Sequence, residues 1–235
     1  GVGGGMGVGG GMGVGGGMGA GGGMGAGGPR PYEHAFCLEA DTTTSGAAVR
    51  WLATQAGILA DEAQIDALAR SVPDAGGVVF VPALTGLNTP YHDHAARGSI
   101  MGLTLGAGKG HIARALLEAI AFQVRAILET ILAQTGLQVQ QLHLGGGLSK
   151  SDLACQLQAD LLGIPVVRPT ETETTARGAA LLAGLGAGVW ASLDVLPPLP
   201  GGEAIFEPDL HPDERQAAFE RWQRAVAHVR AWGAG

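Results

Sequence analysis

The sequence predicts an α/β fold, in which helices and strands alternate along the chain and pack in layers. Residues 77–81 and 164–167 are short β-rich runs bounded by turn formers, whereas residues 109–134 place apolar side chains at helical spacing. In addition, the apolar run at residues 142–144 leads directly into three glycines and a further helical pattern. Such alternation favours a layered α/β domain over an all-helical or all-strand one.

Four elements are expected in the first part of the chain. Residues 47–56 form an amphipathic helix, because Thr44–Gly46 offers a cap before it and Gly57 ends it. Asp61 opens a second helix over residues 61–71, with apolar residues on one side. A strand over residues 77–81 is stopped by Pro82, and residues 99–104 form a second strand after an irregular stretch.

The second part continues the alternation. The long helix over residues 109–134 stops at Gly136, and the strand at 142–144 follows it. Ser149 or Ser151 caps the next helix, which runs to Leu162. We expect the remaining elements to be a strand at 164–167, an Ala- and Leu-rich helix at 174–187, and a polar-faced helix within 208–232.

Composition divides the chain at Pro29–Pro31. Residues 1–28 are glycine-rich hexads, GVGGGM three times and GAGGGM once, followed by GAGG, and they hold four of the five methionines. Glycine loses much conformational entropy on ordering and has no side chain to bury, so we expect a disordered low-complexity tail. A glycine-rich sheet or a self-association segment is the alternative. Residues 29–235 are expected to form one domain.

Charge and cysteine content exclude several classes of protein. The net charge is −7 and no cluster of Lys or Arg occurs, which disfavours nucleic-acid or anionic-membrane partners. Cys37 and Cys155 lack metal or redox spacing and are expected to be reduced thiols in a cytoplasmic protein. The most apolar run, residues 178–191, is too short to span a bilayer, and the start has no signal-peptide pattern. A chain that begins at Gly1 suggests a fragment or a processed product.

The best candidate for a binding site is the strand–glycine–helix passage at residues 142–162. Glycines let a ligand approach the backbone closely, and a helix N-terminus presents unpaired N–H groups that suit a phosphate. From Gly145–Gly147 alone, a plain tight turn is an equally good interpretation. The pattern GxGxxG is absent from this passage, which disfavours a Rossmann dinucleotide site. Gly108–Gly110 is no P-loop either, because Leu103 replaces its first glycine and Gly110 its Ser or Thr.

Other polar residues have simpler structural interpretations. His92, Asp93 and His94, even with His111 or His143, match no zinc spacing and are expected to be solvated loop residues. Glu118, Asp152 and Asp160 lie on predicted helices, where capping or a surface position explains them better than acid–base catalysis does. No Ser/His/Asp or Cys/His arrangement stands out.

Residues 80–125 resemble the C-terminal core of the FGGY family of carbohydrate kinases, and its glycerol kinase branch in particular. The most specific part is residues 98–118, a GxxxGLT strand followed by a loop and HIxRAxxE at the start of a long helix. Further segments agree in order and spacing; they are 45–52, 144–169, 173–190 and the region of Trp222. The triple glycine is more similar to the xylulokinase branch, since glycerol kinases have aspartate in place of Gly145.

The resemblance implies an actin-like ATPase domain of the ribonuclease-H type, which clamps ATP with its Mg²⁺ against a second such domain. The nucleotide-binding residues that it implies are Gly46, Arg50, Gly146, Gly147 and Ser151. Arg50 and Ser151 stand where glycerol kinases usually have glutamine and asparagine. No catalytic or metal-binding residue is implied here, because the aspartate base, a phosphate-facing loop and most magnesium contacts belong to the family's N-terminal domain.

The expected function is therefore ATP-dependent phosphorylation of a polyol or sugar, with this chain as the nucleotide-binding half. Glycerol is the first choice of substrate and xylulose the second, and the chain alone is expected to be inactive. Family members often form dimers or tetramers, which allows a homo-oligomer. Two other functions stay open: a non-catalytic nucleotide-binding module, and an interaction protein that acts through its glycine-rich tail.

Overall fold

The computed structural model describes residues 40–42, 44–198 and 200–233. The predicted tail, residues 1–28, and Cys37 lie outside these ranges. The α-helices are α1 (Gly46–Thr54), α2 (Ile65–Arg70), α3 (Lys109–Thr135), α4 (Asp152–Leu162), α5 (Thr174–Gly186) and α6 (Pro212–Gly233). Short 3₁₀ helices are η1 (Glu62–Gln64), η2 (Gly147–Lys150) and η3 (Leu193–Val195). The strands are β1 (Val79–Val81), β2 (Ser99–Met101), β3 (Leu142–His143), β4 (Val166–Pro169) and β5 (Glu203–Phe206).

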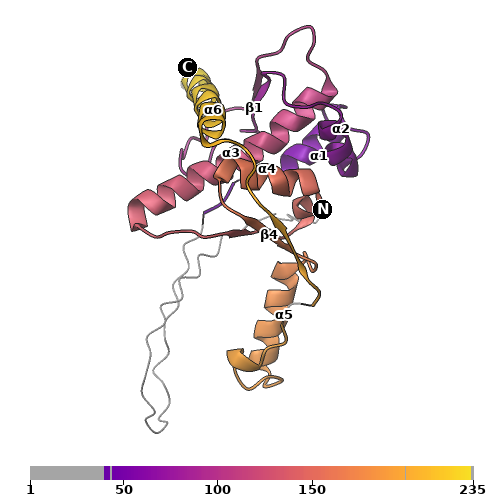
Figure 1. Ribbon diagram of the computed structural model, residues 1–235, viewed down its shortest axis with the longest axis vertical. Coiled ribbons are helices and arrows are strands. Elements are labelled where there is room, and N and C mark those ends of the chain that lie inside the picture. Colours follow the sequence, from indigo (N-terminus) through magenta and orange to yellow (C-terminus); the bar gives the residue numbers. More distant parts are fainter. Residues whose placement is uncertain (1–39, 43, 199, 234–235) are drawn as a thin grey trace.

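Helix α3 runs through the middle of the helical body, and α2, α4, α6 and β1 pack around it (Figure 1). Its start is capped by the Nδ1 atom of His111, which accepts a hydrogen bond from the Gly108 N–H at 3.0 Å. It ends at Gly136, which adopts the left-handed conformation with φ 69°, a conformation that glycine adopts without steric cost. Small and branched residues along α3 are buried almost continuously from Ala113 to Leu128.

The main core joins the first and last thirds of the described chain. Phe80 on β1, Phe122 on α3, and Phe219 and Trp222 on α6 belong to one cluster of buried side chains. The Phe122 and Trp222 rings stack at 5.7 Å between centroids. The indole N–H of Trp222 donates to the backbone oxygen of Phe80 at 3.1 Å, across 142 positions of sequence. Helix α6 therefore closes the body by packing on elements formed much earlier in the chain.

Two separate sheets are present in the described residues. Strands β1 and β2 form an antiparallel pair, with Phe80 opposite Ile100. The second sheet has the order β3–β4–β5, with β3 parallel and β5 antiparallel to β4. Helix α4 covers one face of this second sheet, where Leu142, Cys155, Ala159 and Val166 form a small core. The predicted α/β class is confirmed, and α4 returning the chain between β3 and β4 is the parallel crossover that such folds use.

Three details differ from the sequence prediction. The expected helix over residues 61–71 is divided, because Asp61 caps the 3₁₀ helix η1 and the α-helix begins only at Ile65. The strand from Ser99 ends at Met101, since Gly102 adopts a positive φ of 76° and turns the chain. Strand β5 was not expected, because its four residues follow a Pro- and Gly-rich stretch and include Glu203.

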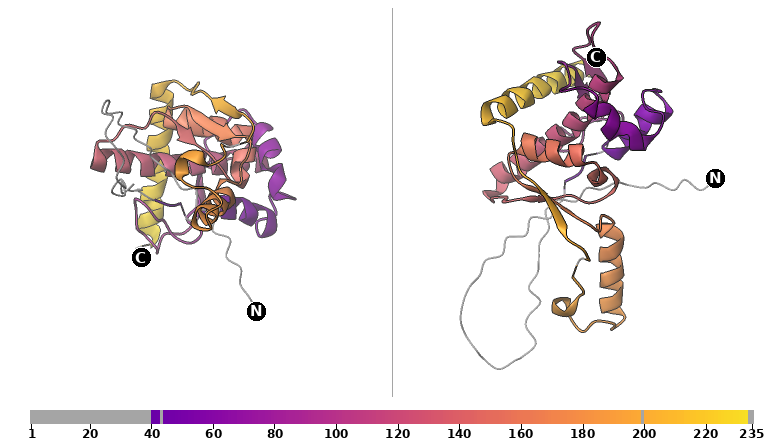
Figure 2. Two further views of the ribbon diagram at one scale, coloured as in Figure 1. Left: turned by 90° about the horizontal axis from the view of Figure 1, so that it is seen from below. Right: turned by 45° about the vertical axis from the view of Figure 1, so that its right-hand side comes forward.

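Helix α5 projects away from the helical body, on the opposite side of the second sheet from α4 (Figures 1 and 2). The chain returns through η3 to β5, so the lobe is an excursion between two neighbouring strands of one sheet. In the part of the chain that the structure describes, no helix has the length and apolarity needed to cross a membrane.

We expect Trp222→Phe to lower the free energy of unfolding by about 1–3 kcal/mol, because it removes the donor to a buried carbonyl and leaves a void. Urea unfolding measures the change. Trp232→Phe is the matched control, since the Trp232 side chain is 83% exposed and its replacement should change stability by less than about 0.5 kcal/mol. Equal effects of the two substitutions would contradict this role of Trp222.

Candidate nucleotide-binding site

The triple glycine connects strand β3 to helix α4 by way of η2. Gly146 has a positive φ of 83°, and its N–H donates to the Thr172 carbonyl oxygen at 2.8 Å. A Cβ atom at Gly145 would lie 2.7 Å from Thr174 Oγ1 and 3.3 Å from the Thr172 oxygen. The segment that leads into α5 thus lies directly against the turn, and only glycine fits at Gly145 without a shift of its neighbours.

Gly147 differs from Gly145, because a Cβ atom there would meet nothing within 4 Å, as is also the case at Gly146. Within the described residues, the backbone N–H groups of Gly147 and Leu148 also have no protein acceptor. The next N–H groups are satisfied, since Ser149 donates to the Gly146 oxygen at 3.2 Å and Ser151 to the Leu148 oxygen at 3.1 Å. Two unpaired donors beside open space are suited to an anionic oxygen of a ligand.

Ser151 is the N-cap residue of α4 and connects the site to α2. Its hydroxyl oxygen accepts from the Ala154 N–H at 3.0 Å, as an N-cap does, and its hydroxyl donates to an Asp66 carboxylate oxygen. The same Asp66 oxygen accepts from the Leu153 N–H at 3.2 Å. The other oxygen pairs with Arg70 at 2.6 Å. Asp66 therefore holds the N-terminus of α4 against α2.

Burial alone would raise the pKa of Asp66, but the hydrogen bond from Ser151, together with those from Arg70 and Leu153, lowers it below its ordinary value of 3.8. The ionised carboxylate is thus the form that the fold stabilises. Sequence reasoning missed this residue, because an aspartate on a short amphipathic helix is indistinguishable from a solvated surface residue without knowledge of what packs against it.

Gly46 and Arg50 lie on α1, outside the turn itself. Gly46 is the first residue of α1, and Arg50 Nε pairs with Glu62 Oε1 at 2.9 Å. Helix α1 packs on η1, η1 packs on α2, and α2 packs on α4, so a series of contacts connects α1 to the start of the candidate site. Among the described residues, no hydrogen bond or ion pair joins Gly46 or Arg50 to Gly146, Gly147 or Ser151.

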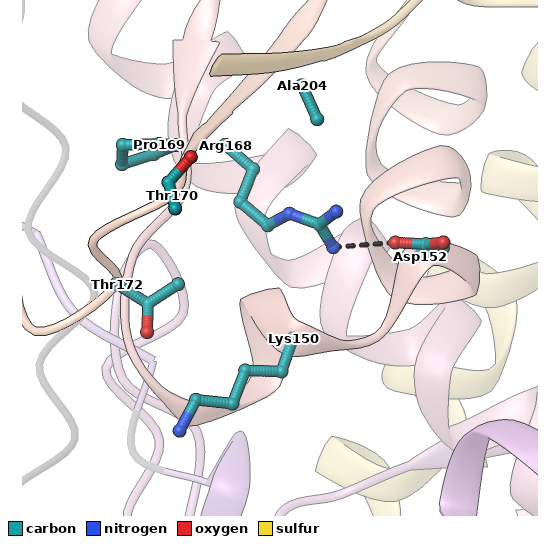
Figure 3. A pocket seen from close by; sticks show the side chains of 7 residues that line it. All are labelled: Lys150, Asp152, Arg168, Pro169, Thr170, Thr172 and Ala204. Carbon is teal, nitrogen blue, oxygen red and sulfur yellow. Dashed lines mark hydrogen bonds and ion pairs between the residues drawn. The ribbon is translucent and has the colours of Figure 1, made fainter. Parts of the chain in front are cut away.

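A shallow pocket of about 370 Å³ lies beside η2 (Figure 3). Arg168 Nη1 crosses it to donate to Asp152 Oδ1 at 2.7 Å and to the Ser149 oxygen at 3.0 Å, which fixes the end of η2. Lys150 and Thr172 point into the same space (Figure 3). The Lys150 ammonium has no carboxylate within ion-pair distance in the described part of the chain. The pocket beside η2 therefore holds one positive charge that no carboxylate of the described residues compensates.

The other candidate polar residues have structural partners. Asp93 accepts from the Ala95 and Ala96 N–H groups at 3.1 Å and pairs with Arg230 at 3.3 Å, which ties the loop to α6. Glu118 pairs with Arg114 at 3.1 Å, and burial raises its pKa despite that cation. Asp160 accepts from the Asp209 N–H at 2.9 Å. In the described ranges, no group of three or more His, Cys, Asp or Glu side chains could hold a metal ion.

Comparison with known proteins gives consistent matches over this region. Residues 25–187 match the C-terminal domain of the FGGY family of carbohydrate kinases. The glycerol kinase of Deinococcus radiodurans is 44% identical over 200 residues, which are 85% of this chain and 40% of that protein. The glycerol kinase of Aromatoleum aromaticum is 47% identical over the same coverage. The chain thus spans about 40% of the length of these curated relatives.

Solved structures agree with the sequence matches. The crystal structure of Plasmodium falciparum glycerol kinase with ADP superposes with a TM-score of 0.71 at 32% identity, over 82% of this chain and 38% of that one. The xylulose kinase of Rhodospirillum rubrum superposes with a TM-score of 0.64 at 30% identity, over 85% of this chain and 40% of that one. The expected actin-like kinase fold is therefore confirmed.

We expect Asp66→Asn to reduce the free energy of unfolding at neutral pH by about 1–3 kcal/mol, because it weakens two charge-assisted hydrogen bonds to the start of α4. Because the folded-state pKa is depressed, this stabilisation is present above pH 3.8 and is lost as the pH falls through the lower folded value. Urea unfolding at several pH values should show the two proteins converging in acid. Asp209→Asn, at an exposed position, is the control.

Proposed function

Because the chain belongs to the FGGY family of carbohydrate kinases, we propose that it supplies the nucleotide-binding half of an enzyme that phosphorylates a polyol or sugar with ATP. The family match covers residues 25–187, and the P. falciparum relative of similar fold was crystallised with ADP. The proposed division of the chain is a glycine-rich segment at 1–28 and the nucleotide-binding domain at 29–235.

The pair of unpaired N–H groups at Gly147 and Leu148 is the observation that supports nucleotide binding most directly. A phosphate oxygen would satisfy both donors, and Lys150, which belongs to the same short helix η2, is proposed to add attraction for a negative charge. Open space at Gly147 leaves room for the ligand, while Gly145 and Gly146 hold the turn close to the segment before α5. The glycines thus have different roles, two in shaping the turn and one in admitting the nucleotide.

We assign the remaining predicted residues to the base and ribose side of the nucleotide. Gly46 and Arg50 on α1 are proposed to contact the nucleotide from the neighbouring helix. Ser151 is proposed to act near adenine while its hydroxyl keeps α4 fixed on Asp66. The side chains of the described residues do not form a metal site, so Mg²⁺ is proposed to arrive with the nucleotide phosphates.

Glycerol is the proposed substrate, because the curated relatives at 44% and 47% identity are glycerol kinases. Xylulose is the second candidate, supported by the triple glycine and by the superposition on a xylulose kinase. Positioning and charge stabilisation dominate phosphoryl transfer, and the residues of this chain correspond to about 40% of the length of these relatives. A cytoplasmic location is proposed on the same family basis.

Calorimetric titration of the full chain with ATP and ADP tests the nucleotide site. We expect micromolar to low-millimolar dissociation constants, and a loss of at least about tenfold in affinity for Gly147→Val, whose side chain would occupy the ligand's space. Gly186→Val is the matched control, because Gly186 is also free of contacts but lies at the far end of α5. A folded chain that binds neither nucleotide would contradict the proposal and favour an interaction protein.

The chain by itself should show no polyol-dependent release of ADP. A coupled assay with glycerol and, separately, with xylulose measures this, and a complete glycerol kinase serves as the positive control. The physical reason is that a nucleotide site without the substrate-binding half cannot align the attacking hydroxyl with the terminal phosphate. Turnover above the blank with either substrate would show that the catalytic groups lie within this chain.

A further inference from the structure

The short helix η2, which carries the proposed phosphate donors, is held in place at three points. Strand β4 and the segment after it supply two of them. The Thr172 oxygen accepts from the Gly146 N–H at 2.8 Å, and Arg168 Nη1 donates to the Ser149 oxygen at 3.0 Å. The third contact comes from helix α2, which packs on α4 and belongs to a different part of the fold. The position of η2 therefore depends on α2 as well as on the second sheet.

Ser151 connects the end of η2 to α2. Its N–H donates to the Leu148 oxygen at 3.1 Å, and its Oγ accepts from the Ala154 N–H at 3.0 Å. Its hydroxyl donates to the Asp66 carboxylate on α2. Leu148 also carries one of the two N–H groups that lack a protein acceptor in the described ranges. The position of that donor therefore depends on Ser151, and the position of Ser151 depends on Asp66.

The Asp66 carboxylate is itself oriented by its surroundings. One oxygen accepts from the Ser151 hydroxyl and from the Leu153 N–H at 3.2 Å. The other oxygen accepts from Arg70 Nε at 2.6 Å, one turn further along α2. The Asp66 side chain is 30% exposed, and α2 packs on both α3 and α4. Because both oxygens have donors, the carboxylate has a defined orientation from which to hold Ser151.

The charge of Asp66 has the wrong sign for direct attraction of a nucleotide. The fold stabilises its ionised form, and a carboxylate repels the phosphates of a ligand. Through charge alone, Asp66 would therefore lower the affinity for ATP. Its hydrogen bonds have the opposite effect, because they hold η2 in one arrangement before the ligand arrives and so reduce the entropy lost on binding. Since the two effects differ in sign, removal of the side chain distinguishes them.

We propose that Asp66 is a positioning residue for the nucleotide site, which acts through the Ser151 hydroxyl to hold the end of η2 and so raises the affinity for the nucleotide phosphates. The proposal rests on the proposed function. It extends the site to α2, a helix that supplies none of the residues proposed above to contact the nucleotide. The effect on affinity is indirect, since Asp66 holds the residue at the end of η2 rather than the ligand.

Calorimetric titration of the full chain with ATP and with tripolyphosphate, both with Mg²⁺, tests this role. We expect Asp66→Ala to weaken binding of both ligands by at least about tenfold, because the end of η2 loses its attachment to α2. Asp66→Asn keeps an acceptor oxygen and should weaken binding less. Asp61→Ala is the matched control and should leave both affinities unchanged. Asp61 is also a capping carboxylate, but it accepts from the Ala63 N–H at 3.0 Å at the start of η1, away from η2.

A double-mutant cycle with tripolyphosphate shows whether Asp66 acts through Ser151, because this ligand has no base that Ser151 could contact. Ser151→Ala should weaken its binding by a similar factor, and Asp66→Ala added to Ser151→Ala should weaken it by less than about twofold more. If Asp66→Ala fails to fold in a urea-unfolding control, Ser151→Ala still tests the proposal, because it leaves the hydrogen bonds of Asp66 with Arg70 and Leu153 in place.

Several outcomes would overturn this role of Asp66. They are an Asp66→Ala chain that binds ATP as tightly as the unsubstituted chain or more tightly, unchanged tripolyphosphate binding by Ser151→Ala, and additive losses in the cycle. Binding of ATP but not of tripolyphosphate by the unsubstituted chain would also overturn it, since the donors of η2 would then not hold the phosphates. An unsubstituted chain that binds neither ATP nor ADP contradicts the proposed function instead, so the two failures are distinguishable.

Discussion

The structure depends on the burial of α3, a long helix whose small and branched residues are covered on several sides at once. Exposing the apolar side chains of such a helix to water is unfavourable, so other elements must cover it. These elements are α2 and β1, which precede α3 in the chain, and α4 and α6, which follow it. Trp222 shows the consequence, because its ring packs on Phe122 while its N–H reaches the Phe80 carbonyl. The two helices that Asp66 and Ser151 join at the candidate site, α2 and α4, both pack on α3, so the same packing fixes their positions.

The glycine turn is the second constraint, and it links local chemistry to the wider fold. Gly145 has no room for a side chain and Gly146 needs a positive φ, so the loop before α5 can lie against the turn. On the opposite side, Asp66 holds Ser151 and Leu153. With both flanks fixed, the two N–H groups at Gly147 and Leu148 are presented to a ligand at little further cost in conformational entropy.

Most elements could be predicted from residue patterns because each pattern is local. The spacing of apolar residues in α3 and its Gly136 stop are visible in the sequence, as are the Ser151 cap and the strand before the glycines. The errors have local causes too: β5 is four residues long and contains Glu203, and Asp61 starts a 3₁₀ turn where a full helix was expected. The conformation of such short segments depends on the strand or helix that they contact. That contacting element lies elsewhere in the sequence, so a local pattern does not reveal it.

By itself, the sequence determined the α/β class, the glycine turn between strand and helix, and the resemblance to carbohydrate kinases, because these reside in spacing and motif order. Only the tertiary structure decided that Asp66 binds Ser151 across 85 positions, that Gly147 has open space where Gly145 has none, and that no residue of α5 is buried. These properties depend on which distant segments come within contact distance, and burial of the apolar core as a whole sets that outcome.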